Sequence, residues 1–155
     1  MFFRLTFPIF YGLFWSFSRL PFFVMYFLSD VLYFFLFTLI GYRKKVAYSN
    51  LKKAFPQKSE AEIQQTLKAF YRHLCDVIVE FFKMISMDES ELRKRMRIVN
   101  PEVFDEINAK TEGVLALATH YGNFEWMSCA TDMHTKNKGY AIYSPLKNPY
   151  FEALA

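Results

Sequence analysis

A histidine and a glutamate lie five residues apart directly after a short apolar run. The run covers residues 114–119, and His120 and Glu125 follow it, with Gly122 in the turn between them. The shortness of the run and the glycine on either side of it favour a buried parallel strand over a helix. Open α/β sheets place their chemistry at the carboxyl ends of strands, so this pattern predicts a reactive His-Glu pair.

The pair suits general-base chemistry on a hydroxyl group. A neutral imidazole, with a usual pKa near ~6.5, can accept the proton, while a carboxylate on the other ring nitrogen fixes the tautomer and stabilises the cation. The hydroxyl can belong to the substrate, so the protein needs no serine or cysteine nucleophile. Spacing alone leaves open an ordinary core or surface histidine. A metal site fits less well, because two ligands without an HExxH pair do not complete one.

The residues after the pair predict a strand-helix-strand unit. Asn123 can cap a helix over 124–133, and Glu125 then lies in its first turn, where the helix dipole favours an acid. A turn at 136–139 leads to a second short strand at 140–143.

The following loop, residues 144–149, would meet His120 at one sheet edge if the two strands are parallel. Such a loop would help to form a substrate site. An ordinary proline-rich connection is the alternative.

The composition divides the chain into two regions with different surroundings. Of 155 residues, 20% are aromatic, including 19 phenylalanines. Residues 1–42 contain most of the phenylalanines and carry only Arg4, Arg19 and Asp30 as charges, whereas residues 43–155 have the mixed charge of a soluble domain. We therefore expect a membrane anchor over 1–42 and a cytoplasmic domain over 43–155.

The apolar segment 20–42 is long enough to cross a hydrocarbon core of ~30 Å as a helix. Asp30 argues against a simple span, because a carboxylate near the bilayer centre costs about 2.5 to 3.5 kcal/mol. The earlier stretch 5–17 is interrupted by Pro8 and Gly12, which favours an interfacial or re-entrant helix. A cleaved signal peptide is the alternative, but no small-x-small cleavage site precedes the second apolar run.

A basic cluster follows the apolar segment directly and places the rest of the chain in the cytoplasm by the positive-inside rule. Anionic headgroups could also bind it. Nucleic-acid binding is disfavoured, since the net charge is only +4 and the cluster adjoins a hydrophobic anchor. The cluster consists of Arg43, Lys44, Lys45, Lys52 and Lys53.

Helices precede the first strand. Ser59 and Glu62 form a capping box, and apolar residues then alternate at three and four positions, which predicts an amphipathic helix over 59–86. Shorter helices are expected over 88–96 and from 101 to about 110. The apolar stripe of the long helix comprises Ile63, Leu67, Phe70, Leu74, Val77, Phe81 and Met84.

Two widely spaced cysteines, Cys75 and Cys129, are expected to be reduced core residues.

Seven blocks in this order resemble the bacterial lipid A biosynthesis acyltransferases of the lauroyl and myristoyl transferase family. The resemblance covers nearly the whole chain, and the position of His-x4-Glu after an apolar strand makes it specific. The blocks are residues 42–47, 50–51, 54–56, 70–73, Asp76 with Glu80, 120–125 and 145–149.

The resemblance implies an enzyme at the cytoplasmic face of the inner membrane that moves a fatty acyl chain from acyl carrier protein to a hydroxyl of a lipid A precursor. It assigns His120 as the general base and Glu125 as its orienting partner. Polar contacts to substrate would come from Asn148, Ser144 and Asn123. No metal or other cofactor is implied. The acidic carrier protein could dock on the basic cluster or on Arg93, Lys94, Arg95 and Arg97.

Members of that family are longer, with further strands and an arginine-bearing block after the second strand. The expected fold is thus α/β and helix-rich: one or more N-terminal membrane helices, then a partial acyltransferase-type strand-helix-strand unit. We expect these 155 residues alone to be inactive. A lysophosphatidate acyltransferase with the same His-x4-acid chemistry and a non-catalytic membrane-anchored protein are the alternatives.

Overall fold

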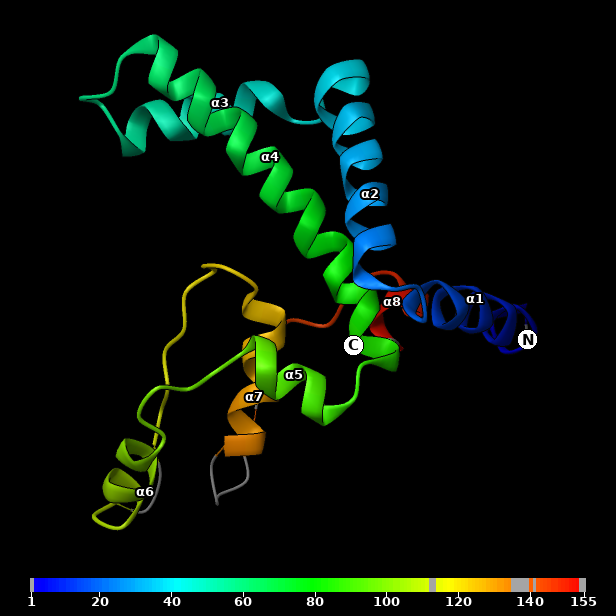
Figure 1. Ribbon diagram of the computed structural model, residues 1–155, viewed down its shortest axis with the longest axis vertical. Coiled ribbons are helices and arrows are strands. Elements are labelled where there is room, and N and C mark those ends of the chain that lie inside the picture. Colours follow the sequence, from blue (N-terminus) through cyan, green and yellow to red (C-terminus); the bar gives the residue numbers. More distant parts are fainter. Residues whose placement is uncertain (1, 112–113, 135–139, 141, 154–155) are drawn as a thin grey trace. The chain divides into compact units, whose positions relative to one another are not determined.

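The computed structural model describes residues 2–111, 114–134, 140 and 142–153, and helices dominate it (Figure 1). Two compact units are present: Leu20–Glu80 forms one, and Met1–Arg19 with Phe81–Ala155 forms the other. The helical elements are α1 (Phe2–Ser18), α2 (Phe22–Tyr33), the π-helical η1 (Phe34–Ile40), α3 (Lys44–Ala54), α4 (Glu60–Lys83), the 3-10 turn η2 (Met84–Ser86), α5 (Glu89–Arg95), α6 (Glu102–Asn108), α7 (Phe124–His134) and α8 (Pro149–Glu152).

Local capping signals place the helices of the second half of the chain where the sequence predicts them. At the start of α4, the backbone N–H of Ser59 donates to the Glu62 carboxylate at 2.8 Å, and the N–H of Glu62 donates to Ser59 Oγ at 3.4 Å. This is the predicted capping box. At α5, Asp88 caps by accepting from the N–H of Glu91 at 2.8 Å. The predicted helices at 59–86, 88–96, 101–110 and 124–133 are therefore confirmed, with small shifts at their ends.

The buried face of α4 differs in part from the predicted stripe. Ile63 and Leu67 are buried as expected, but the face then continues at intervals of four residues through Tyr71, Cys75 and Val79. Phe70 is 44% exposed. A strict four-residue ridge drifts around a helix of 3.6 residues per turn, so the residues that α4 buries near its end lie next to those that an averaged three-four pattern selects.

In unit Leu20–Glu80, α2 and η1 run antiparallel along α4. Polar contacts join the start of α2 to the end of α4, and aromatic contacts continue along η1. The antiparallel order is seen in the contacts themselves: Tyr26 Oη donates to Glu80 Oε1 (2.7 Å), Ser29 Oγ donates to Asp76 Oδ1 (2.6 Å), Arg72 lies over the Tyr33 ring (5.3 Å), and the rings of Phe37 and Tyr71 lie 5.2 Å apart.

A left-handed turn links η1 to α3. Gly41 ends the π-helix with φ 64°, which glycine adopts without penalty, and Arg43 follows with φ 48°. The buried Tyr71 hydroxyl donates to the Tyr42 carbonyl in this turn. The turn returns the chain to α4, where Ala47 packs against the core of Phe37, Leu67 and Tyr71.

In the other unit, aromatic side chains hold α8 against α1 and the end of α4. The predicted helix over residues 5–17 lies within α1, which continues through Pro8. Its interfacial or re-entrant placement stays a prediction. The ring contacts are Phe10 with Tyr150 (5.1 Å) and Phe151 (5.6 Å), Phe14 with Phe82 (4.4 Å) and Phe151 (6.4 Å), and Phe17 with Phe82 (6.0 Å).

No strand occurs among the residues that the structure describes, so the predicted strand-helix-strand unit is not confirmed. Residues 114–119 form an irregular segment, in which Leu115 is 78% and Leu117 is 91% exposed. A strand needs a neighbour to satisfy its backbone N–H and C=O groups, and within the described residues this segment has no strand partner. Gly113, the turn at 136–139 and Ala141 of the second predicted strand lie outside the described residues.

Among the described residues, one helical segment, Phe22–Ile40, has the 19 residues and the apolar composition needed to cross a membrane. It lies within the predicted 20–42 segment. The predicted boundary between an anchor and a cytoplasmic domain at residues 42 and 43 stays a prediction.

Candidate active site

His120 lies at the junction between the irregular segment 114–119 and α7. Its side chain is exposed, and its ring lies 4.3 Å from the ring of Phe124. The backbone turns here through a hydrogen bond from the Tyr121 N–H to the Thr119 carbonyl (2.8 Å) and through Gly122, whose φ of 60° favours glycine. The local sequence thus presents His120 at the amino end of a helix.

Asn123 and Glu125 take the positions at the start of α7 that the sequence predicts. Asn123 Oδ1 accepts from the Trp126 N–H at 3.1 Å and so caps the helix. Glu125 is half-buried in the first turn. A carboxylate is stabilised at this end of a helix by the exposed N–H groups and the helix dipole.

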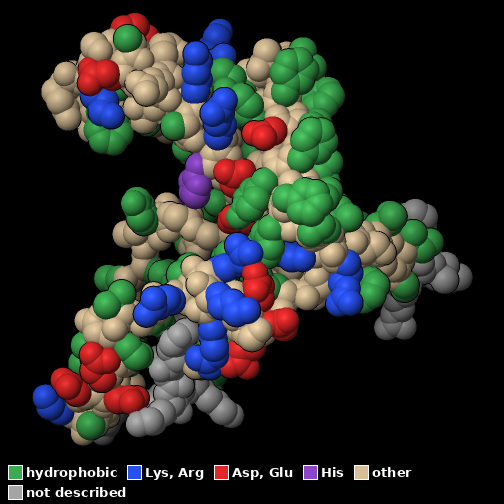
Figure 2. Space-filling view, in the orientation of Figure 1, with side chains coloured by type: hydrophobic (Ala, Val, Ile, Leu, Met, Phe, Trp, Pro, Cys, Tyr) green, Lys and Arg blue, Asp and Glu red, His purple; other side chains and the backbone are tan. Residues whose placement is uncertain are grey.

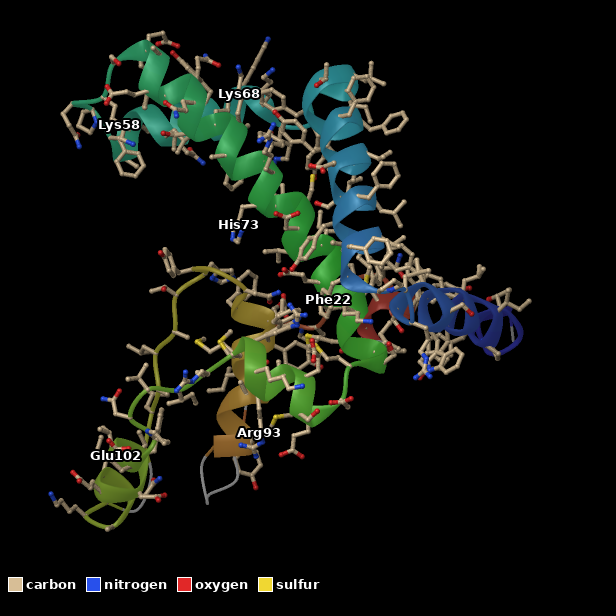
Figure 3. All side chains as sticks on the ribbon, viewed as in Figure 1. Phe22, Lys58, Lys68, His73, Arg93 and Glu102 are labelled. Carbon is tan, nitrogen blue, oxygen red and sulfur yellow. The ribbon has the colours of Figure 1, made fainter. Side chains whose placement is uncertain are left out.

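Packing against α5 fixes the orientation of α7. Leu92 of α5 and Trp126 and Ala130 of α7 are buried. Arg93 adds a polar contact, because its Nη2 donates to the Met133 carbonyl at 2.7 Å, and Figure 3 shows it beside the end of α7. The helix that carries Glu125 is therefore held at both its middle and its end.

The two side chains of the predicted pair are near in sequence but are not hydrogen-bonded to each other in the described part of the chain. His120 contacts Phe124 instead, and the backbone carbonyl of Glu125 accepts from Ser128 Oγ at 2.9 Å. Rotation of the exposed imidazole would be needed to form the pair. Catalytic hydrogen bonds are often long or misaligned before substrate binds.

Glu152 organises the loop at 144–149, a role that the sequence reasoning missed. Its carboxylate accepts from Tyr143 Oη at 2.9 Å and from the Leu146 N–H at 2.6 Å. The hydrogen bond to Glu152 raises the pKa of the Tyr143 hydroxyl. A carboxylate six residues beyond the amide that it accepts from gives no periodic sequence signal, so only the folded loop reveals it.

The other candidate substrate contacts lie in this loop. Asn148 caps α8, since its Oδ1 accepts from the Tyr150 N–H at 2.9 Å, and Ser144 is exposed. Neither Asn148 nor Ser144 is hydrogen-bonded to His120 or Glu125 within the described residues. The structure therefore presents two separate groups of candidate site residues, one at the start of α7 and one at the start of α8.

The basic residues of α5 are largely neutralised by glutamates on the same helix. Arg93 pairs with Glu89 at 2.6 Å, while Arg95 and Lys94 both pair with Glu91, at 2.7 and 3.7 Å. These are exposed i,i+3 and i,i+4 pairs, which contribute little to stability. As a docking surface for an acidic protein, α5 is consequently weaker than its sequence suggests. No group of three or more metal-ligating side chains occurs in the part of the chain that the structure describes.

Comparison with protein families identifies the class to which this arrangement belongs. Residues 4–155 match the model of the bacterial lipid A biosynthesis acyltransferases. The match extends over nearly the whole chain, so the protein belongs to this family, as the sequence resemblance indicates. No curated protein and no solved structure matches it.

Proposed function

We propose that this protein transfers a fatty acyl chain from acyl carrier protein to a hydroxyl of a lipid A precursor, with His120 as the general base. The family supports acyl transfer in lipid A biosynthesis. The observation that carries the assignment of residues is the position of His120 immediately before α7, with Glu125 in the first turn of that helix.

In the proposed reaction, the neutral imidazole of His120 removes the proton of the acceptor hydroxyl while the oxygen attacks the thioester carbonyl. A C–O bond forms, the tetrahedral oxyanion collapses, and the C–S bond breaks. The leaving thiolate takes up a proton, and the imidazolium returns to its neutral form. Glu125 orients the ring and stabilises its protonated state, provided that His120 rotates from Phe124 toward the carboxylate.

Polar groups for substrate binding come from Asn123, Ser144 and Asn148. Asn148 uses Oδ1 as a helix cap, and its side-chain amide N–H groups are donors suited to a substrate oxygen. Neither a metal ion nor another cofactor is needed for this chemistry. The basic cluster at 43–53 is the proposed contact for the acidic carrier protein or for anionic headgroups, and the protein acts at the cytoplasmic face of the inner membrane.

The reaction is tested by incubating membranes that contain the protein, expressed from its own gene, with an acyl carrier protein thioester and a lipid A precursor. A time-dependent mass increase of one acyl chain on the precursor is expected. A lysophosphatidate acceptor in a parallel reaction tests the glycerolipid alternative. Transfer to lysophosphatidate but not to the lipid A precursor would show that the acceptor is a glycerolipid. Transfer to neither would favour the non-catalytic alternative.

We also propose that the 155-residue chain has no transferase activity by itself. Holding thioester and hydroxyl in near-attack geometry contributes roughly 7 to 11 kcal/mol, which a His-Glu pair without surrounding walls does not provide. Both His120 and Ser144 are exposed, and the segments that carry them are irregular. His120-dependent acylation by this chain alone would show that the described segments are enough to position the thioester and the hydroxyl.

A further inference from the structure

We propose that α2 and η1 lie flat in the boundary between the headgroups and the acyl chains of an anionic bilayer, rather than crossing it. This inference rests on the membrane association proposed above and not on acyl transfer. It concerns only unit Leu20–Glu80, in which α2, η1 and α4 are packed together.

The contacts with α4 oppose a crossing orientation. Asp76 and Glu80 accept hydrogen bonds from Ser29 and Tyr26 of α2, so α4 lies alongside the apolar segment. A crossing α2 would carry these carboxylates into the hydrocarbon, where ionised side chains are costly. Asp30, which is exposed on α2 itself, would also lie near the bilayer centre.

Further along the segment, Arg72 of α4 lies over the ring of Tyr33 at 5.3 Å. The charged residues of α4 thus accompany the apolar segment over most of its length, and a local shift of either helix end would not remove them from the membrane.

The face of α2 and η1 turned away from α4 is exposed and mostly apolar, with Asp30 between Phe27 and Phe34 as the charged residue on it. Phe23 is 76%, Phe27 65% and Phe34 50% exposed, whereas Met25 and Ser29 on the opposite face are buried. Figure 2 shows hydrophobic side chains gathered over α2. One face of the segment therefore packs on protein and the other is free for lipid, which is the arrangement of a helix that lies in an interface.

The side of α4 that faces away from α2 carries an exposed histidine, in agreement with a surface orientation. Figure 3 shows His73 projecting from this side of α4. With α2 in the membrane surface, this side of α4 meets water. In a crossing arrangement, it would meet lipid.

Charge selects an anionic bilayer as the partner. The basic cluster follows η1 directly in the sequence. Lys45 and Lys53 of the cluster are exposed, and Lys44 Nζ lies 3.8 Å from the centre of the Phe37 ring. Lys44 and Lys45 also line a shallow surface depression with Tyr48 and other residues of α3 and α4. Cations that directly follow the apolar segment suit the headgroups of phosphatidylglycerol.

Nitroxide depth measurements distinguish the two orientations. The full chain, with Cys75→Ala and Cys129→Ala, receives one spin label at a time through Phe23→Cys, Phe27→Cys or Phe34→Cys and is reconstituted in vesicles of phosphatidylethanolamine and phosphatidylglycerol. Oxygen and a water-soluble nickel chelate then report the depth of each label.

We expect all three labels at one depth, about 5 to 10 Å below the headgroups. In a crossing helix, Phe23 and Phe34 are separated by roughly 16 Å along the membrane normal, so depths that increase steadily from Phe23 toward the middle of the segment would overturn the proposal. So would labels that all remain in water. A His73→Cys label is the matched control and should be accessible to the nickel chelate.

A second measurement does not depend on spin labels. Ser16→Cys and Lys53→Cys, in the same background, flank the segment at exposed positions. A membrane-impermeant maleimide should label Lys53→Cys only in inverted vesicles, and Ser16→Cys should show no labelling from the periplasmic side. Labelling of Ser16→Cys in right-side-out vesicles would overturn the proposal.

Discussion

At the residue scale, burial makes the thiol of Cys75 less acidic than an exposed thiol. Its pKa is raised to about 11, chiefly by burial in the α4 face, with a smaller effect from the neighbouring Asp76 carboxylate. Because the thiolate is the reactive form, Cys75 should be inert to alkylation in the folded chain. Cys129 is only half-buried.

We therefore expect iodoacetamide at pH 7 to modify Cys129 at least about 10-fold faster than Cys75. Peptide mass spectrometry of the modified chain measures the ratio, and urea-unfolded chain is the control in which both cysteines react. Equal rates in the folded chain would contradict the packing of Cys75 in the α4 face.

Glu60 is the second residue whose ionisation the structure alters. Hydrogen bonds from Tyr48 (2.6 Å), Gln64 (3.1 Å) and Lys52 (3.0 Å) lower its pKa from 4.5 to about 2. A carboxyl group with a lowered pKa in the folded state stabilises the fold above its unfolded pKa, and this stabilisation is lost as the pH falls to the folded value.

The contact between α3 and α4 should thus weaken between pH 4.5 and about 2. Urea unfolding of the solubilised chain across this range measures the effect. Glu60→Gln should make the midpoint less dependent on pH, while Glu106→Gln, at an exposed position of α6, should not. An unchanged pH dependence in Glu60→Gln would show that these hydrogen bonds contribute nothing to folding. The side chains of Glu60 and Lys52 are exposed, so the effect on the free energy of unfolding is small.

At the element scale, one carboxylate holds the loop that precedes α8. Glu152→Ala removes the acceptor for both the Tyr143 hydroxyl and the Leu146 N–H, and hydrogen bonds of this kind contribute on the order of 1 kcal/mol each. The loop should open more often. We expect cleavage by trypsin after Lys147 to become about fivefold faster or more, with Glu106→Ala as a control of unchanged rate. Equal rates in the two variants would show that Glu152 does not hold the loop.

The helices could be predicted from sequence because their signals are local. Ser59 and Glu62 stand three residues apart, and the hydrogen bonds that they make are complete within one turn. Asn123 is predictable as a cap for the same reason. The exact buried face of α4 is harder to predict from sequence, because whether Phe70 or Tyr71 faces the core depends on where η1 packs.

Interactions between distant elements could not be predicted in this way. Asp76 and Glu80 are recognisable as paired acids on one helix, but nothing local shows that Ser29 and Tyr26, some fifty residues earlier, donate to them. The predicted strand at 114–119 is not confirmed, for a related reason. An apolar run shows that a segment suits a strand, whereas a strand exists only when a neighbour pairs with its backbone.

At the scale of the whole molecule, the family assigns lipid A acyl transfer and the structure places His120 and Glu125 around one helix start. His73 offers a matched control, because it is an exposed histidine on a different element, α4. Substituting the two histidines in turn therefore separates a specific catalytic role from the general loss of an imidazole.

The most direct measurement is the rate of acylation of the lipid A precursor, followed by mass spectrometry, for His120→Ala and His73→Ala in the protein expressed from its own gene. We expect a fall of about 10² to 10⁴-fold for His120→Ala, the range for loss of a general base, with unchanged membrane association. His73→Ala should retain nearly the full rate. Near-normal acylation by His120→Ala would contradict the proposal that His120 is the general base.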